Sequence, residues 1–178
     1  VVMIDVPFEL SQPRSSIQDI HKKLGADPVV GAEVGVRLGE HAQCLLNYLP
    51  VGHLFLVDDW EENFANIGVT GDEAYDFVRR KFGWLPSVTV LRVESLVGAR
   101  LLHALRGGLS FVYIDANHDY EYVLADLREW WPVLCSGGVL CGHDYCTNEQ
   151  VMRAVKEFAK EHTLEIQSDG PEFWMEKP

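Results

Sequence analysis

The chain has 178 residues, of which 47% are hydrophobic and 24% are charged, a composition that is typical of one globular domain with a buried core. Its formal net charge of −12 argues against a nucleic-acid or anionic-membrane surface, because such surfaces are bound through Lys and Arg. No apolar run approaches the roughly 20 residues that a membrane span needs. We therefore predict a single domain over residues 1–178 that acts on a small neutral or cationic substrate, without a nucleic-acid or membrane partner.

The first residues and the cysteines predict the location of the protein. The N-terminal segment VVMIDVPFELSQPR lacks the basic stretch and the long apolar core of a signal peptide. The four cysteines show neither a CxxC pair nor the spacing of zinc ligands, which favours buried and reduced thiols. Both observations predict a cytoplasmic protein, because reduced thiols are the rule in that compartment.

Five apolar segments alternate with helical patterns along the chain. Their hydrophobicity is continuous, which predicts strands that are buried on both faces of a parallel sheet. The segments are GAEVGV (31–36), HLFLVD (53–58), SVTVLRV (87–93), SFVYID (110–115) and GGVLCGH (137–143). The tail LEIQSDGPEFWMEKP predicts a short strand, a turn at Asp169-Gly170-Pro171 and a final strand, which together form a hairpin at the sheet edge. A homodimer that forms through the apolar residues of this hairpin stays an open alternative. These residues are Phe173, Trp174 and Met175.

The segments between the strands carry apolar residues at helical spacing. Thr70 and Glu73 predict a capping box for a helix that ends at Gly83. Ser95 is a candidate cap for the following helix. The predicted buried face of that helix comprises Val97, Leu101, Leu102 and Leu105, and Gly107-Gly108 would end it.

In sheets of this type ligands bind beyond the carboxyl ends of the strands, so the residues there are candidates for a site. The first strand ends in EVGVRLG, where Gly35 and Gly39 allow a tight turn and a close approach to a ligand. This spacing lacks the middle glycine of the GxGxxG loop, so a simple tight turn stays open. Asp58 ends the second strand, where nucleoside-binding α/β proteins place a carboxylate on the ribose hydroxyls. After the third strand, Glu94 or Ser95 would face the adenine edge.

The fourth and fifth strands end in FVYIDANHDY and GHDYCTN. If these strands are neighbours, Asp115, His143 and Asp144 lie side by side. Such groups suit three tasks: orienting a substrate hydroxyl, holding a divalent metal and acting as a general base. The structural alternative is that Asp115 and Asn117 cap the following helix while His118 is their hydrogen-bonded partner.

Taken together, the motifs resemble those of the class I S-adenosylmethionine-dependent methyltransferases. The segments that carry the resemblance are EVGVRLG, LVDDW, YIDANHDYEYVLADLREWWPVLCSGGVLCGHDY and VMRAVKEFAKEH…FWMEK, from about Ile17 to Lys177. They are most similar to small O-methyltransferase-like domains with a D-G-x-H-x-Y segment at strand four and a G-G-x-x-x-x-H-D-Y segment at strand five. The resemblance implies an α/β, Rossmann-like three-layer sandwich with a mostly parallel seven-stranded sheet and an antiparallel C-terminal hairpin.

The resemblance also implies a role for each strand end. The cofactor S-adenosyl-L-methionine would be bound by Glu33, Gly35, Gly39, Asp58, Glu94, Ser95 and Asp115, with Asp58 on the ribose hydroxyls. The residues that face the methyl acceptor would be Asp115, His118, His143 and Asp144. Of these, the first three are the predicted catalytic residues, and Asp115 and Asp144 are the candidate ligands of Mg²⁺.

Three departures from the family pattern qualify the resemblance. Ala116 replaces the usual glycine after Asp115, and Glu94 stands where a shorter Asp is common. Related metal-dependent O-methyltransferases carry two acidic residues at strand five, whereas here His143 precedes Asp144. The need for Mg²⁺ is therefore left open.

We expect methyl transfer to the hydroxyl of a small metabolite or sugar. A neutral hydroxyl is a poor nucleophile, and either His118 or His143 would take its proton. The loop Glu61–Asp72 and the N-terminal DVPFELSQPR are expected to choose the acceptor. Two alternatives stay open: an NAD-dependent oxidoreductase, disfavoured by the missing glycine, and a non-catalytic cofactor-binding module of a larger biosynthetic system.

Overall fold

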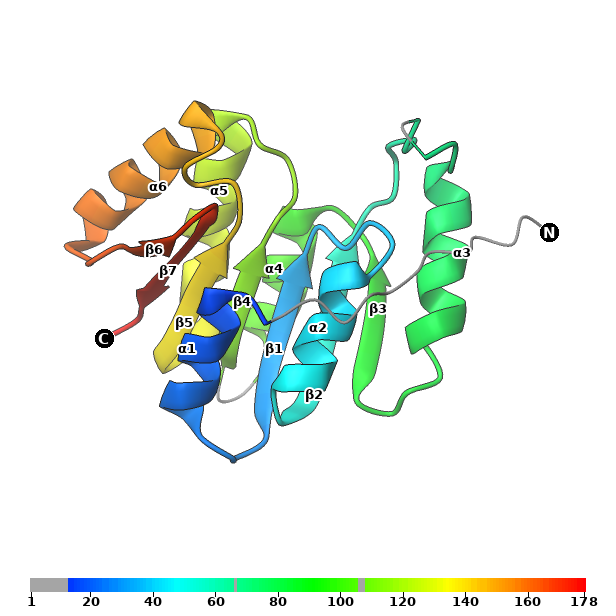
Figure 1. Ribbon diagram of the computed structural model, residues 1–178, viewed down its shortest axis with the longest axis horizontal. Helices are drawn as coiled ribbons and strands as arrows, with labels where there is room; N and C mark the ends of the chain where they lie inside the picture. Colours follow the sequence, from blue (N-terminus) through cyan, green and yellow to red (C-terminus); the bar gives the residue numbers. More distant parts are fainter. Residues whose placement is uncertain (1–12, 66, 106–107) are drawn as a thin grey trace.

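The computed structural model describes residues 13–65, 67–105 and 108–178. Its centre is a seven-stranded sheet with the strand order β3-β2-β1-β4-β5-β7-β6 (Figure 1). The strands are β1 (Val29–Val34), β2 (Val51–Asp58), β3 (Val88–Arg92), β4 (Leu109–Ile114), β5 (Leu134–Gly142), β6 (Gln167–Asp169) and β7 (Glu172–Glu176). Strands β1 to β5 are parallel, and β7 runs antiparallel to both of its neighbours. The predicted fold class is confirmed.

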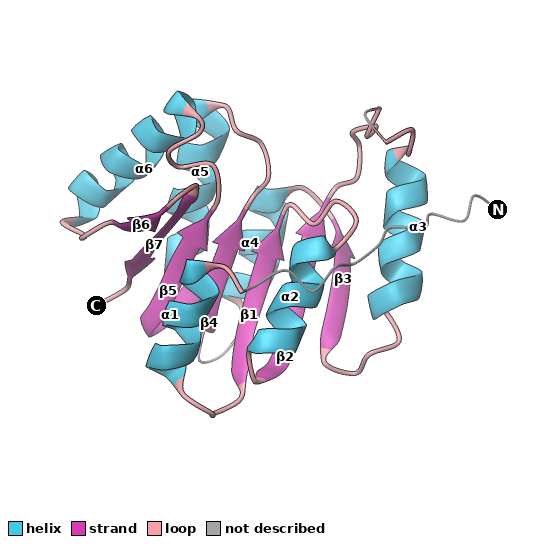
Figure 2. Cartoon of the chain, in the orientation of Figure 1, coloured by secondary structure: helices cyan, strands magenta, loops and turns pink. Residues whose placement is uncertain are grey.

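Six helices cover the two faces of the sheet (Figure 2). One apolar cluster packs α1 (Ser15–Leu24), α2 (Glu40–Tyr48) and α3 (Gly71–Phe82) on the first face. A second cluster packs α4 (Ser95–His103), α5 (Tyr120–Trp130) and α6 (Glu149–His162) on the opposite face. A short 3₁₀ turn, Trp131–Val133, joins α5 to β5. Within the described ranges, no helix combines the length and apolar character that crossing a membrane requires.

The central strands are buried on both faces, as their continuous hydrophobicity predicts. In β4, for example, five of the six residues are buried and the sixth is half-buried. All five predicted strands form, but their bounds shift: β1 begins and ends two residues earlier than predicted, β2 begins two residues earlier, and β5 begins three residues earlier. Parallel strands with helices on both faces exclude water from both sides, so these strands are mainly apolar, and a buried acid such as Glu33 of β1 is an exception.

The interpretation of α4 is corrected by the structure. Its buried face consists of Gly98, Ala99 and Leu102, because a Cβ at Gly98 would collide with Val57 of β2. This close approach of the helix to the sheet turns the larger side chains outward, so three residues of the predicted buried face are exposed: Val97, Leu101 and Leu105. Ser95 does not cap the helix through its side chain. The predicted stop at Gly107 lies outside the described residues.

The C-terminal hairpin forms where it was predicted. Its apolar strand, however, lies inside the sheet and not at the exposed edge. Strand β7 pairs with β5 on one side and β6 on the other. Phe173 and Met175 of β7 are consequently buried in the core, and the edge is formed by the exposed strand β6. The homodimer therefore stays a prediction without support from these side chains.

The strand order places a site at one edge of the sheet. From β1 the chain continues to β2 and β3 on one side of β1. It then crosses over to β4, which lies on the other side of β1. At such a switch point the two outgoing connections diverge and leave a crevice beyond the carboxyl ends of the strands. Here the crevice opens above β1 and β4, so the ends of these two strands are its floor.

The capping box of α3 offers a test of the fold. The Thr70 hydroxyl accepts a hydrogen bond from the Glu73 amide, and the Glu73 carboxylate accepts one from the Thr70 amide. We expect Thr70→Ala to lower the free energy of unfolding by about 1 kcal/mol, because an amide at the helix start loses its partner. Thr70→Ser keeps the hydroxyl and is the control. Equal stability of the two variants in urea denaturation would contradict this role of the cap.

Candidate functional site

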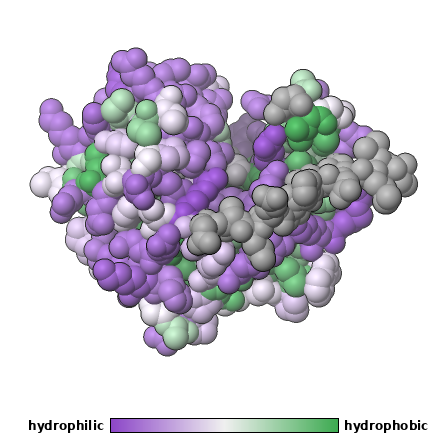
Figure 3. All heavy atoms as spheres, in the orientation of Figure 1, coloured by the Kyte–Doolittle hydropathy of each residue, from purple (hydrophilic) through white to green (hydrophobic). Residues whose placement is uncertain are grey.

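A cavity of ≈ 850 Å³ lies at the carboxyl ends of the parallel strands. Its floor comes from the ends of β1, β2, β4 and β5, and the loops that follow these strands form its walls. The surrounding surface is largely hydrophilic, and it is hollowed at its upper edge in Figure 3. All but one of the predicted site residues line this cavity; the exception is Gly39, which is buried against the Phe82 ring.

The glycine loop after β1 is shaped by its contact with β4. Gly35 has a φ of 86°, and a Cβ there would collide with the backbone carbonyl of Asp115. Gly39 has a φ of 78° and directly precedes α2. Arg37 also adopts a left-handed φ, 54°, which a side chain disfavours. The loop is thus held in a demanding conformation by the strands around it.

Asp58 at the end of β2 braces this glycine loop. Its carboxylate accepts hydrogen bonds from the backbone amides of Val36 (2.8 Å), Arg37 (2.9 Å) and Trp60 (2.7 Å). Burial raises the pKa of Asp58, and the three amide hydrogen bonds oppose that rise. Trp60 is buried, and its indole donates to the Arg37 carbonyl, so it is a packing residue.

A buried acid and a buried imidazole meet at the end of β1. Glu33 is 1% exposed, and its Oε1 lies 3.2 Å from Nδ1 of His41. Burial raises the pKa of Glu33 and lowers that of His41, because each loses the hydration of its charged form. Two polar atoms in this pair are buried without a hydrogen-bond partner, Oε2 of Glu33 and Nε2 of His41. Both residues line the cavity, so a polar ligand there would find unsatisfied groups.

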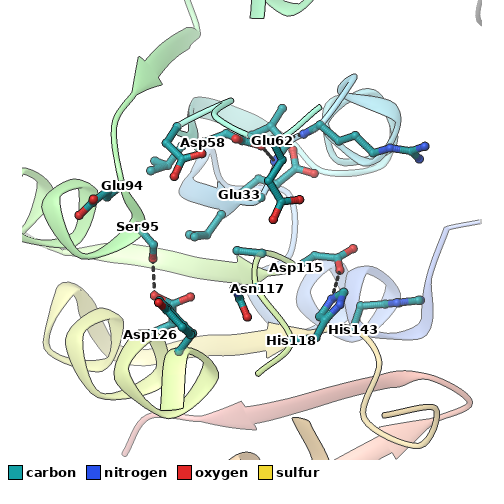
Figure 4. Close-up of a pocket in the computed structure, with 18 of the residues that line it drawn as sticks. Glu33, Asp58, Glu62, Glu94, Ser95, Asp115, Asn117, His118, Asp126 and His143 are labelled. Carbon is teal, nitrogen blue, oxygen red and sulfur yellow. Dashed lines mark hydrogen bonds and ion pairs between the residues drawn. The ribbon is translucent and has the colours of Figure 1, made fainter. Parts of the chain in front are cut away.

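At one end of the cavity, Ser95 and Asp126 face each other across the gap between α4 and α5 (Figure 4). The Ser95 hydroxyl donates to Asp126 Oδ1 (2.5 Å) and accepts from the Trp130 indole (2.9 Å). The side chain of Ser95 is therefore engaged within the protein. Glu94, immediately before α4, is exposed and also lines the cavity.

At the other end, the two strand-end motifs bring four side chains together (Figure 4). His118 Nε2 lies 3.4 Å from Asp115 Oδ1 and 3.2 Å from Asp144 Oδ2. The His143 Nδ1 atom lies 3.2 Å from the same Oδ2. The hydrogen bond to Asp115 raises the pKa of His118, while burial opposes the rise. Burial alone would raise the pKa of Asp144, but Thr147, His143 and His118 together hold it below its ordinary value.

This arrangement differs from the structural alternative for the segment after β4. Asn117 accepts a hydrogen bond from the Asp119 amide, which is a local turn. Asp119, and not Asp115, is the residue at the start of α5. The Asp115 carboxylate points to His118 across the cavity rim and is one-quarter exposed, so it does not cap the helix.

The structure adds a group of residues that the sequence analysis missed. Arg14 precedes α1 and contacts the Tyr113 hydroxyl, Glu172 Oε1 (3.4 Å) and Asp115 Oδ2 (3.8 Å). Glu172 is 4% exposed and also accepts from the amide and the hydroxyl of Ser16. These residues are far apart in sequence, and no local pattern connects them. Asp126 was missed as well, although a carboxylate on the apolar face of a predicted helix is a recognisable signal.

Residues 32–145, more than half of the chain, match the family described as "Methyltransferase domain". The chain belongs to this family. With its sheet order and C-terminal hairpin, it is a class I S-adenosylmethionine-dependent methyltransferase, so the predicted family and enzyme class are confirmed. No curated protein matches the sequence.

Solved structures share the fold of this methyltransferase at low sequence identity. The O-methyltransferase NovP is 16% identical with a TM-score of 0.67, over 90% of this chain and 78% of NovP. The O-methyltransferase from Bacillus cereus, solved with SAH, is 14% identical with a TM-score of 0.64, over 94% and 82%. The MycE methyltransferase, solved with Mg, SAH and mycinamycin VI, is 13% identical with a TM-score of 0.61, over 90% and 48%.

Asp126 gives the methyltransferase a measurable pH dependence of stability. Burial raises the pKa of this carboxyl from 3.8 to about 6, and the Ser95 hydrogen bond opposes the rise. Because the pKa is higher in the folded state than in the unfolded state, ionising Asp126 lowers the free energy of unfolding. This loss is absent below about pH 4 and complete above about pH 6. We expect Asp126→Asn to gain stability over the wild type as the pH rises through this window, by at most roughly 3 kcal/mol. Urea denaturation of both proteins from pH 4 to pH 7 measures this, and a constant difference would contradict it.

Proposed function

We propose that the protein transfers the methyl group of S-adenosylmethionine to a hydroxyl of a small metabolite or sugar. The observation that carries this proposal is the cluster of Asp115, His118, His143 and Asp144 at one end of the cavity. A hydroxyl must lose a proton during methylation, and the cluster offers imidazole and carboxylate groups at the place where that proton is released.

The cavity fits the cofactor in three places. The unpartnered Oε2 of Glu33 suits the ammonium group of the methionine moiety. The glycine loop, held by Asp58, brings its backbone to the cavity wall without a Cβ at Gly35. Beside its three amide hydrogen bonds, Asp58 keeps one of its roughly four lone-pair sites, on Oδ1, for a ribose hydroxyl. When bound, the cofactor supplies a methyl group that is already activated on a sulfonium.

Residues of the protein then position the acceptor and take its proton. Asp115 holds His118 through its Oδ1, which fixes the ring at the rim of the cavity. His118 is positioned to take the acceptor proton, and His143 is the second candidate for the same task. Because the methyl transfer is an in-line displacement, holding donor and acceptor in line is the other contribution of the protein.

A divalent metal is a further part of the proposal. Ligand atoms of Asp115, His118 and Asp144 all lie within 4.8 Å of one another. The two carboxylates, which are the ligands predicted from the sequence, suit Mg²⁺ or Mn²⁺. If His118 joins them as a nitrogen ligand, its ring no longer takes the acceptor proton, and that task falls to His143. A bound cation would stabilise the oxyanion of the acceptor. The structure of MycE with Mg supports considering a metal in this fold.

The class of acceptor is inferred from the cavity and from structural neighbours. MycE was solved with the macrolide mycinamycin VI, and CalS11 is described as a TDP-rhamnose 3′-O-methyltransferase. Both support a small hydroxylated acceptor for the present chain. The family match argues against the oxidoreductase alternative, whereas a non-catalytic module is still to be tested by activity. None of the four cysteines forms a disulfide with a described residue, although Cys146 is exposed and not buried as expected; this supports a cytoplasmic site of action.

Asp115→Asn tests the catalytic cluster. We expect it to lower turnover by about 10²- to 10⁴-fold, because His118 loses its carboxylate partner, Asp115. The affinity for SAH should be unchanged, since the carboxylate points to His118, and Arg14 keeps its contacts with Tyr113 and Glu172. Turnover is measured as SAH formed with any sugar or phenol of a panel that the wild type methylates.

Asp119→Asn is the matched control for this experiment. Asp119 is exposed, lies four residues further along the same segment and does not line the cavity. Normal turnover is therefore expected. Loss of SAH binding in Asp115→Asn would show that Asp115 belongs to the cofactor site. A wild type that binds SAH but methylates no acceptor would favour the non-catalytic module.

Calorimetric titration with SAH, with and without Mg²⁺, tests the cofactor and the metal separately. We expect micromolar binding of SAH and no binding of NAD to the same protein. A Mg²⁺-dependent heat that Asp144→Asn removes would support the metal site. The same heat in both proteins would count against these ligands, and binding of NAD alone would overturn the proposed cofactor site.

A further inference from the structure

Arg14 occupies a distinctive position at the floor of the cavity. It lies between Asp115 at the rim and the buried Glu172 of β7, and its guanidinium carbon is 5.4 Å from the centre of the Tyr113 ring. Glu172 also accepts from Ser16 and from the Tyr113 hydroxyl (2.7 Å). The backbone before α1 is thereby fixed against the sheet, and Arg14 is held with it.

Within the part of the chain that the structure describes, only one edge of the Arg14 guanidinium is used. All its hydrogen bonds and ion pairs with the described residues run through Nη1. Arginine carries five N–H donors in a fixed plane, so donors on Nε and Nη2 are left for a ligand. The side chain is 32% exposed and lines the cavity. A planar guanidinium of this kind matches the geometry of a carboxylate.

The unpartnered carboxylate oxygen of Glu33 lies at the same end of the cavity. Arg14 contacts the hydroxyl of Tyr113 on β4. Tyr113 pairs with Glu33 of β1, and its ring centroid lies 3.8 Å from that of His41, so Arg14 lies near both buried groups. Glu33 offers an acceptor for an ammonium, and Arg14 offers donors for a carboxylate. An α-amino acid carries these two groups on one carbon, so a single amino-acid head satisfies both residues.

We propose that Arg14 binds the α-carboxylate of the cofactor's methionine moiety. This inference rests on the proposed function, because it requires that the cofactor lies along the cavity with its methionine at Glu33. Arg14, directly before α1, then belongs to the cofactor site, and the buried Glu172 is a positioning residue that holds it. Binding of the cofactor would complete the charge balance around Asp115 and Arg14.

The cavity contains a second arginine, Arg37, but its surroundings are different. Its guanidinium carbon lies 5.6 Å from the centre of the Phe64 ring, in the loop after β2. Arg37 interacts with the described residues of that loop, whereas Arg14 interacts with β4 and β7 beside Glu33. The contact of Arg14 with Tyr113, which pairs with Glu33 between β1 and β4, singles out Arg14 for the amino-acid end of the cofactor.

The test compares two ligands that differ only in the carboxylate. Calorimetry would measure binding of SAH and of decarboxylated SAH to the wild type and to Arg14→Gln. We expect Arg14→Gln to weaken binding of SAH by roughly 10- to 100-fold, because a charge-assisted hydrogen bond is lost. Binding of decarboxylated SAH should be unchanged, since that ligand has no carboxylate for Arg14.

Two control variants separate this role from a structural one. Arg37→Gln makes the same chemical change elsewhere in the cavity and should alter the binding of both ligands equally. Ser16→Ala removes a hydrogen bond to Glu172 and should lower the melting temperature while leaving the preference for the carboxylate intact.

The outcomes are distinguishable. Equal weakening of both ligands by Arg14→Gln would overturn the inference, because Arg14 would then act only on the fold. A wild type that binds neither ligand would overturn the proposed cofactor site, and this inference with it. A wild type that prefers SAH over its decarboxylated analogue, with the preference lost only in Arg14→Gln, would establish the contact.

Discussion

The close approach of the glycine loop to the end of β4 determines how the site is assembled. Gly35 packs on the backbone carbonyl of Asp115, and the Asp115 amide donates to the Val34 carbonyl (2.7 Å). Any side chain at position 35 would push these strand ends apart. This one backbone contact therefore places both the glycine loop after β1 and Asp115, the first residue of the cluster with His118, His143 and Asp144. Asp58 completes the arrangement, because its carboxylate fixes the loop from the other side.

Buried carboxylates surround this contact, and each is compensated differently. Glu172 receives hydrogen bonds from Ser16, Tyr113 and Arg14, so its lone pairs are satisfied within the protein. Glu33 is satisfied at one oxygen only. Since an unpaired buried polar atom costs about 1–3 kcal/mol, the fold tolerates at Glu33 a cost that a ligand removes. The contrast separates a carboxylate that holds the structure together from one that is available to a ligand.

The sequence predicted the parts of this fold that depend on local patterns. Continuous apolar runs identify β1 to β5, and the pair Thr70 and Glu73 identifies the start of α3. Strand ends also follow from these runs, so the candidate residues at the carboxyl edge could be named before the structure. Packing decided what local patterns could not. The outward face of α4 depends on how closely Gly98 approaches β2, and the burial of Phe173 depends on β7 lying inside the sheet.

Non-local contacts explain why Arg14 escaped prediction. Arg14 and Glu172 are 158 residues apart, and they meet only because β7 inserts next to β5 and α1 packs beside it. No spacing rule in the sequence encodes that contact. His41 on α2 lines the cavity in the same way, because the packing of its helix against the sheet places it there. Asp126 differs, because a carboxylate on the apolar face of α5 is a local signal.

The charge of the cavity links the structure to the proposed chemistry. Ten of the residues that line it are acidic, and only two are arginines. Such a lining favours cationic ligands and disfavours anionic ones, because like charges across a partly enclosed cavity repel one another. A sulfonium cofactor is a cation before transfer and a neutral sulfide afterwards, so the same field that attracts the donor holds the product less strongly. An acceptor with a phosphate would enter against this field, which is why a neutral or cationic hydroxyl compound suits the cavity best.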